Sequence, residues 1–133
     1  MSRPPFLAIA HVQLAMPAAE EETARRFFVD LCGMVEIAKP ADLAKRGGCW
    51  FRSGAVEIHL GVEQEFRPAV KAHPALVCDN YAVLIARLKA ANVPVREDLE
   101  ILGTRRSHIA DPFGNRIELI ANTAQGLGGN NAV

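Results

Sequence analysis

Three histidines and one glutamate are spaced along the chain as two matched pairs. His11 and His73 lie 62 residues apart, and His59 and Glu118 lie 59 residues apart. Taken singly, each is more often a hydrogen-bonded or exposed side chain than a ligand. Together they form a donor set that suits Zn, Ni, Mn, Fe or Co, and its lack of thiolates argues against a closed structural zinc site. A divalent ion with an open position can polarise a carbonyl or enediolate oxygen, or hold a substrate together with dioxygen.

The elements that must position these residues also occur twice. Apolar residues follow the i, i+3, i+4, i+7 spacing of an amphipathic helix at 24, 27, 28 and 31, and again at 81, 84, 85 and 88. The first helix opens on acidic residues 20–22 and stops near Gly33, and the second begins at Asp79 as N-cap and ends before Pro94. One strand is expected before each helix and three after it, at 7–15, 34–38, 48–53 and 55–62, then at 72–78, 96–101, 104–110 and 115–121.

This βαβββ order, repeated, predicts an α+β fold in one domain of two modules, about 6–64 and 70–122. Side chains alternate across a strand, so a polar residue between two apolar ones faces away from the apolar row. His59 lies between Ile58 and Leu60, and Glu118 lies between two apolar neighbours in the same way. If the apolar rows pack beneath the helices, the four candidate ligands converge on the opposite, concave surface.

Composition excludes several classes of protein. The chain has 133 residues with 15 Lys and Arg against 15 Asp and Glu, and this balance argues against nucleic-acid binding. No apolar run is long enough for a membrane span or a signal peptide, so we expect a cytoplasmic protein. Cys32, Cys49 and Cys78 lie in apolar segments without metal-site spacing, which indicates buried free thiols.

The cations point to a small anionic substrate. Eleven of the 15 are arginines, which suit bidentate recognition of carboxylates and phosphates. Most arginines in proteins are solvated surface charges, but several here lie close in sequence to the candidate ligands. The residues we select as substrate-binding candidates are Arg52, Arg67, Arg105 and Trp50. Trp50 and its neighbour Phe51 must face opposite sides of a strand, one toward the core and one toward the site. His108 has no match in the repeat, so it is structural or faces substrate.

Three motifs resemble the vicinal oxygen chelate superfamily, which includes glyoxalase I, fosfomycin resistance enzymes, extradiol dioxygenases and bleomycin resistance proteins. They are H-x-x-L from His11, F-F-x-D-L-C-G-M at 27–34, and above all A-D-P-F-G-N-R-I-E-L-I at 110–120. The resemblance implies a cup-shaped, partly open β-barrel with helices outside. It implies metal ligands on the first and last strands of each module, which here are His11, His59, His73 and Glu118.

Members of the superfamily differ at the position of His59. Glyoxalase I commonly has a carboxylate there, so the base that it would use on that side is absent from this position. The fosfomycin enzymes and extradiol dioxygenases use a triad that matches His11, His73 and Glu118, which makes His59 an additional ligand or a group beside the metal. Residues 45–54 and 66–76 resemble glyoxalase-like proteins of unassigned reaction and indicate no substrate.

The leading hypothesis is a metal-dependent glyoxalase-like enzyme of lyase, isomerase or transferase type. A divalent ion would chelate vicinal oxygens of a small anion, and Glu118 or His59 would move a proton. One alternative is a metal-free binding protein like the bleomycin resistance proteins, and another is an extradiol-type dioxygenase. A homodimer is expected, because two modules must pair to close the cup, within one chain or by exchange between two chains.

Overall fold

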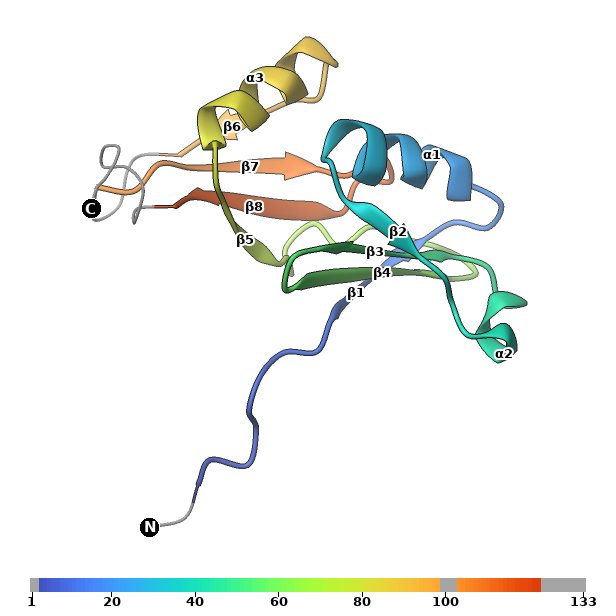
Figure 1. Ribbon diagram of the computed structural model, residues 1–133. Coiled ribbons are helices and arrows are strands. Elements are labelled where there is room, and N and C mark those ends of the chain that lie inside the picture. Colours follow the sequence, from blue (N-terminus) through green and yellow to red (C-terminus); the bar gives the residue numbers. More distant parts are fainter. Residues whose placement is uncertain (1–2, 99–102, 123–133) are drawn as a thin grey trace.

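Two four-stranded sheets of the same topology make up the fold (Figure 1). The computed structural model describes residues 3–98 and 103–122. The first module consists of β1 (Val12–Met16), α1 (Glu21–Arg25), the π-helical turn η1 (Arg26–Leu31), β2 (Val35–Ile37), α2 (Ala41–Ala44), β3 (Cys49–Ser53) and β4 (Val56–Val62). The second consists of β5 (Ala75–Cys78), α3 (Tyr81–Ala90), β6 (Arg96–Glu97), β7 (Arg106–Ala110) and β8 (Arg116–Ala121). The predicted α+β class and the repeat of the βαβββ order are confirmed.

Each sheet brings the first and last strands of its module side by side. The strand orders are β1-β4-β3-β2 and β5-β8-β7-β6, and in both sheets the first pair is parallel and the others are antiparallel. In one sheet Gln13 is opposite His59, and in the other Ala75 is opposite Glu118. The residues just before β1 and β5 therefore lie beside the last strand of their own module.

The apolar faces of the two sheets share one core with the helices. Phe28 of η1 stacks on Phe51 of β3 with ring centroids 5.2 Å apart. The buried cluster takes residues from both modules, namely Leu14, Met16, Ala24, Phe27, Phe28, Phe51, Ile58, Leu60, Tyr81, Ile85, Leu88, Ile109, Ile117 and Leu119. The faces that carry His59 and Glu118 are opposite the faces that form this core.

The turn between β7 and β8 joins the modules. Asp111 Oδ1 accepts hydrogen bonds from the backbone N–H groups of Phe113 and Asn115, each at 2.9 Å, which shapes the turn. The buried Asn115 side chain donates to the carbonyl of Ala15 in β1 at 2.8 Å and accepts from the N–H of Ala69 at 3.0 Å. Its amide thus connects the second module to the first strand and to the linker.

Several elements differ from their predicted bounds. β1 starts at Val12, which is opposite Ile58 in β4, and not at residue 7 as predicted. β5 starts at Ala75, after Pro74, which has no N–H to donate. His11 and His73 therefore precede strands rather than lie within them.

The helices also differ in detail from the expectation. The N-cap of the second helix is Asn80, in the left-handed region with φ of 53°, rather than Asp79, and α2 was not predicted. The first helical segment ends at Leu31, near Gly33 as expected, and the φ of 77° at Gly33 favours glycine. Part of the predicted strand at 96–101 lies outside the described residues.

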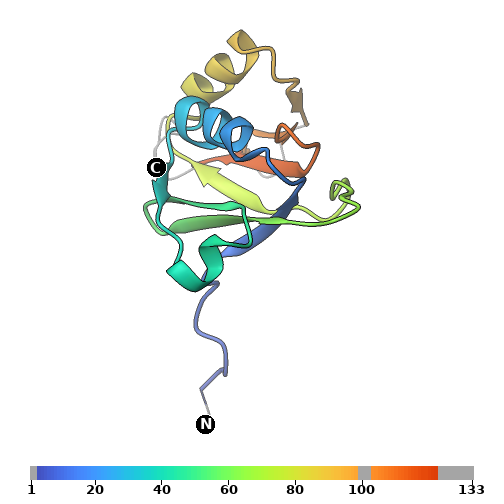
Figure 2. The same ribbon diagram turned by 90° about the vertical axis from the view of Figure 1, so that its right-hand side faces the viewer.

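The segment before His11, from residue 3 on, extends away from the sheets as an arm, in both Figure 1 and Figure 2. Its apolar side chains Phe6, Leu7 and Ile9 are 88%, 90% and 79% exposed. Exposed apolar side chains in such a group are typical of a surface that contacts another molecule. Among the described helices, none has the length and apolar character needed to cross a bilayer.

Candidate metal centre

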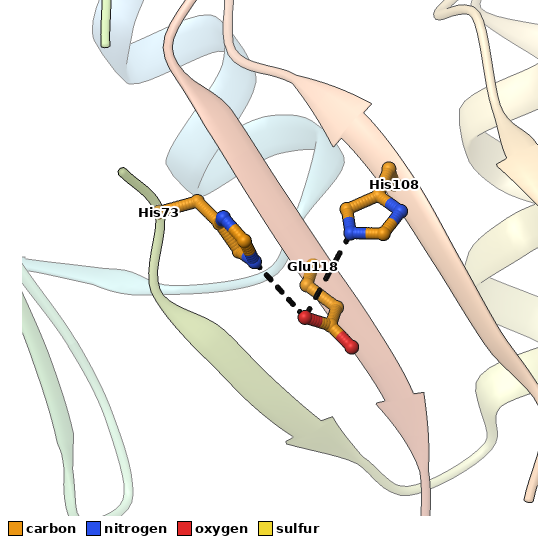
Figure 3. A group of neighbouring side chains, drawn as sticks. All are labelled: His73, His108 and Glu118. Atoms are coloured by element: carbon orange, nitrogen blue, oxygen red, sulfur yellow. Dashed lines mark hydrogen bonds and ion pairs between the residues drawn. The ribbon is translucent and has the colours of Figure 1, made fainter. Parts of the chain in front are cut away.

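Three metal-capable side chains converge on the polar face of the second sheet (Figure 3). Glu118 comes from β8, His108 lies directly opposite it on β7, and His73 precedes β5 on the other side of β8. His73 Nε2 lies 3.0 Å from Glu118 Oε1, and His108 Nε2 lies 3.7 Å from the same oxygen. The donor atoms of all three lie within 4.8 Å of one another, which is the spacing of a group that could hold a metal ion.

In each of these three side chains, the polar atom that faces away from the other two also has a hydrogen-bond or ion-pair partner. His73 Nδ1 lies 2.8 Å from the carbonyl oxygen of Lys71, and His108 Nδ1 lies 2.7 Å from Asp98 Oδ2. Glu118 Oε2 pairs with the guanidinium of Arg106 on β7. Such outer contacts fix the orientation of metal ligands in known metal sites. The arrangement therefore directs the inner atoms of all three side chains toward one another, where a cation could bind.

Local charges favour the forms that bind metals. Burial raises the pKa of Glu118, but the hydrogen bond with His73 and the charge of Arg106 outweigh burial, and the net pKa is lowered. Burial and the charge of Arg116 lower the pKa of His108, although Asp98 and Glu118 oppose this effect. Glu118 is therefore a carboxylate, and His108 a neutral imidazole, at neutral pH.

A stack of rings occupies the corresponding face of the first sheet. The His59 ring is sandwiched between His11, with centroids 4.0 Å apart, and Trp50, with centroids 3.9 Å apart. His59 is 4% exposed, and its Nε2 lies 2.7 Å from Glu57 Oε2. The hydrogen bonds from His59 and from Arg52 lower the pKa of Glu57. Trp50 thus lines the polar face and Phe51 joins the core.

The predicted arginines occupy different positions. Arg52 lies on the face of His59 and pairs with Glu57 at 3.2 Å. Arg67 is exposed in the linker between the modules. Arg105 lies over the Tyr81 ring at 4.9 Å and pairs with Glu97, so it is directed to the helix side of its sheet rather than to Glu118. Its neighbour Arg106, on the opposite face, contacts Glu118 instead.

The four predicted ligands form two pairs in one chain. His11 lies against His59, and His73 lies against Glu118, but within residues 3–98 and 103–122 no metal-capable group includes both pairs. Sequence reasoning did not assign His108 to the group. The alternation of buried Ser107 and Ile109 around His108 is a signal that could have placed it on the face of Glu118.

The three cysteines are free thiols as expected, but Cys32 and Cys78 are only partly buried. No disulfide joins the described cysteines, and Cys49 is buried. Burial raises the pKa of Cys32 to about 12 and that of Cys49 to about 11. Neither side chain is a reactive thiolate at neutral pH.

Comparison with known proteins identifies the fold. A scan of protein-family models and a search of curated proteins gave no match. Among solved structures, a protein from Bacillus anthracis assigned to the glyoxalase family is 44% identical, with a TM-score of 0.87, over 92% of this chain and 100% of that chain.

Two more distant likenesses show the fold alone. The genomically encoded fosfomycin resistance protein FosX from Listeria monocytogenes is 18% identical, with a TM-score of 0.70, over 89% of this chain and 95% of its own. TnmS3, an antibiotic binding protein from a Streptomyces species, is 23% identical, with a TM-score of 0.66, over 89% of this chain and 100% of its own. Because the Bacillus anthracis protein is matched along its whole length at 44% identity, this chain belongs to the glyoxalase family of the vicinal oxygen chelate superfamily.

Proposed function

We propose that this protein is a metal-dependent glyoxalase-like enzyme, of lyase, isomerase or transferase type, acting on a small anion with vicinal oxygens. The observation that carries the proposal is the contact of His73 Nε2 with Glu118 Oε1 at 3.0 Å. The Lys71 carbonyl accepts a hydrogen bond from His73 Nδ1, and this contact directs Nε2 of the same ring toward the carboxylate of Glu118. A divalent cation could replace the hydrogen bond between these two atoms and bind both of them.

The donor set suits a divalent ion such as Zn, Ni, Mn, Fe or Co. His73 and Glu118 would hold it from the second module, and His11 from a first module. When bound, the ion would polarise substrate oxygens and stabilise negative charge that develops on them. Glu118 is assigned the ligand role rather than a proton-transfer role, because both of its oxygens are already engaged.

His59 is the residue we assign to proton transfer. Its Nε2–H is directed to Glu57, so the lone pair of Nδ1 is free to accept a proton. Glu57 would then stabilise the imidazolium that forms. Position 59 lacks the carboxylate that glyoxalase I commonly has there. Glu57, two residues earlier on the same strand face, would instead assist proton transfer through its contact with His59.

The substrate would lie beside the ring of Trp50, within reach of cationic side chains. Arg52 shares the face of His59, and exposed Arg67 makes no ion pair with a described residue, so both can meet an anion. Arg105, already paired with Glu97 on the other side of its sheet, is a weaker candidate than Arg106.

We also propose that two chains assemble the site as a homodimer. The polar faces of the two sheets lie opposite the core that they share, so the first module of one chain can face the second module of another. The exposed arm with Phe6, Leu7 and Ile9 supplies apolar contact area for such a dimer.

Two measurements test the proposal. Protein purified without an affinity tag should contain close to one transition-metal ion per site, or take it up on titration. A mixture of chains carrying His11→Ala with His59→Ala and chains carrying Glu118→Gln should regain about a quarter of wild-type activity, because half of the dimers are mixed and each has one intact site. If the protein takes up no metal, the proposal of a metal-dependent enzyme is contradicted. If the mixed chains regain no activity, the proposal that modules of two chains form each site is contradicted.

A metal-free binding protein is the second candidate. The likeness to an antibiotic binding protein and the flat ring surface of Trp50 and His59 favour a planar ligand. Tight binding of such a ligand by metal-free protein, unaffected by His73→Ala, would favour this function. Oxygen uptake with iron and a catechol would instead identify an extradiol-type dioxygenase.

A further inference from the structure

We propose that Arg116 and Arg96 bind a carboxylate of the substrate in a pocket beside the candidate metal centre. The role of this pocket in substrate binding rests on the proposed function and deepens it, because it names the substrate class. The substrate would be a short aliphatic acid whose carboxylate is separate from the vicinal oxygens that bind the ion. Neither arginine is among the substrate-binding candidates taken from the sequence.

Strand register places both arginines on the polar face of the second sheet. Arg96 of β6 is opposite His108 of β7, and His108 is opposite Glu118 of β8. Arg116 lies two residues before Glu118 on the same strand, so its side chain leaves the sheet on the same side. The two arginines therefore flank β7 on the face of the candidate metal centre.

A pocket of about 350 Å³ is lined by both arginines, and this volume is near the lower end for small-molecule sites. His108 also lines the pocket, so the pocket adjoins the candidate metal centre. Val95 and Val70, which is 66% exposed, contribute apolar parts of the wall. Two cations beside an apolar wall suit a ligand that combines an anionic group with a short aliphatic part.

The ion pairs on this face leave one positive charge without an acidic partner. Arg106 pairs with Glu118, and Arg96 Nε lies 3.7 Å from Asp98 Oδ1. Within residues 3–98 and 103–122, Arg116 forms no ion pair. An anion that enters the pocket would supply the missing partner, because it would meet a guanidinium that no carboxylate of the protein neutralises.

Arg116 has most of its hydrogen-bonding capacity available. Its Nη1 lies 3.5 Å from the carbonyl oxygen of Val70, at the outer limit for a hydrogen bond. A guanidinium has five N–H groups, so this contact leaves two parallel ones for a bidentate carboxylate. Arg96 already lies near Asp98, and its side chain is 65% exposed. We therefore assign the larger share of the binding to Arg116.

Binding of isobutyrate to metal-free full-length protein tests this assignment. Acetate has a smaller aliphatic part and inorganic phosphate has none, so ligand-observed NMR at constant ionic strength should show that isobutyrate binds more tightly than either. Arg116→Gln should weaken isobutyrate binding by at least about tenfold, because it removes hydrogen bonds to a charged group. Arg96→Gln should weaken it by about threefold, as expected for an exposed ion pair. Arg46→Gln, which changes an exposed arginine of the first module, is the matched control and should bind like wild type.

Arg116→Lys separates charge from geometry and provides a milder variant in case Arg116→Gln does not fold. It keeps the charge without the planar fork, so its affinity should lie between those of wild type and Arg116→Gln. If wild-type protein does not bind isobutyrate, or if Arg116→Gln binds it like wild type, this inference is overturned. Tighter binding of phosphate than of isobutyrate would overturn the aliphatic acid as the substrate class.

Zinc uptake by the same proteins distinguishes this inference from the proposed function. Arg116→Gln should take up Zn²⁺ like wild type, because Arg116 is not one of the proposed ligands. Zinc uptake without isobutyrate binding by wild-type protein would remove the carboxylate pocket and leave the metal-dependent enzyme. Isobutyrate binding without zinc uptake would support the pocket and contradict the metal-dependent enzyme.

Discussion

The two modules have sheets of the same topology, but the polar faces of these sheets carry different kinds of side chains. The second module has two histidines and one glutamate that could bind a metal ion, His73, His108 and Glu118. The ring nitrogen of each histidine that faces away from Glu118 has a hydrogen-bond or ion-pair partner. The first module presents a stack of rings backed by Glu57 and Arg52. A repeated scaffold therefore does not require repeated function, and we infer that one face binds the ion while the other moves the proton.

The largest expected difference between the faces is in metal affinity. Glu118→Gln should weaken metal binding by more than about 100-fold, because it removes the shared carboxylate ligand. Glu57→Gln, the matched change on the first face, should leave the affinity within about threefold, well below the cost of an outer contact to a ligand. Calorimetric titration with Zn²⁺ measures both. Equal losses in the two variants would mean that the first face holds the ion too.

The turns that close the modules should differ in their contribution to stability. Asn115→Ala should lower the free energy of unfolding by about 2–3 kcal/mol, because it leaves the Ala15 carbonyl and the Ala69 N–H without their partner. Ser53→Ala, in the equivalent turn of the first module, should change it by less than about 0.5 kcal/mol. Urea denaturation of both variants tests this contrast, and similar losses would contradict it.

Acid should destabilise both faces in the metal-free protein. The pKa values of Glu57 and Glu118 are lowered in the folded state, so the stability that these carboxylates contribute is present above their unfolded pKa of about 4.5. It is lost as the pH falls through the lower folded values. Thermal unfolding between pH 6 and pH 3 should show this decline, with a smaller slope for Glu118→Gln. An unchanged slope would mean that Glu118 gains nothing from His73 and Arg106.

The smallest expected effect is in fluorescence, because Trp50 is the single tryptophan and lies on the first face. At protein concentrations where the chain is monomeric, Zn²⁺ binding to the second module should leave the emission unchanged. At concentrations where dimers form, the same titration should shift it. A shift that does not depend on protein concentration would indicate that the two faces already meet within one chain.

Much of the fold could be predicted because it rests on local periodicity. The pattern of apolar residues predicts the buried faces of the helices. It also predicts the alternation of Ile58, His59 and Leu60 and the position of Phe51 in the core. Strand ends were less predictable, since the pairing of β1 begins with Val12 opposite Ile58, far away in the chain. Sequence spacing contains no information about that partner.

The site was predictable in its types of residue and less so in its contacts. The repeat matched His73 with His11 and Glu118 with His59, but His108 and Glu57 have no match in it. Strand register places His108 opposite Glu118, and Glu57 lies two residues before His59 on the same strand face. The choice between Arg105 and Arg106 depends on where β7 begins, because Arg106 is its first residue and Arg105 precedes it, and the start of that strand could not be fixed from the sequence. The cytoplasmic location, the bound metal and the homodimer stay predictions.

The Asn115 link has a consequence for symmetry. Because it ties the turn of the second module to β1 of the first, it fixes the angle between two sheets whose polar faces lie on opposite sides of a common core. If the polar face of each module binds the complementary face of another chain, that angle determines the type of assembly. Two chains either form a closed dimer around a two-fold axis or continue into an open filament. A single buried amide would then control the closure of the assembly as well as the stability of the fold.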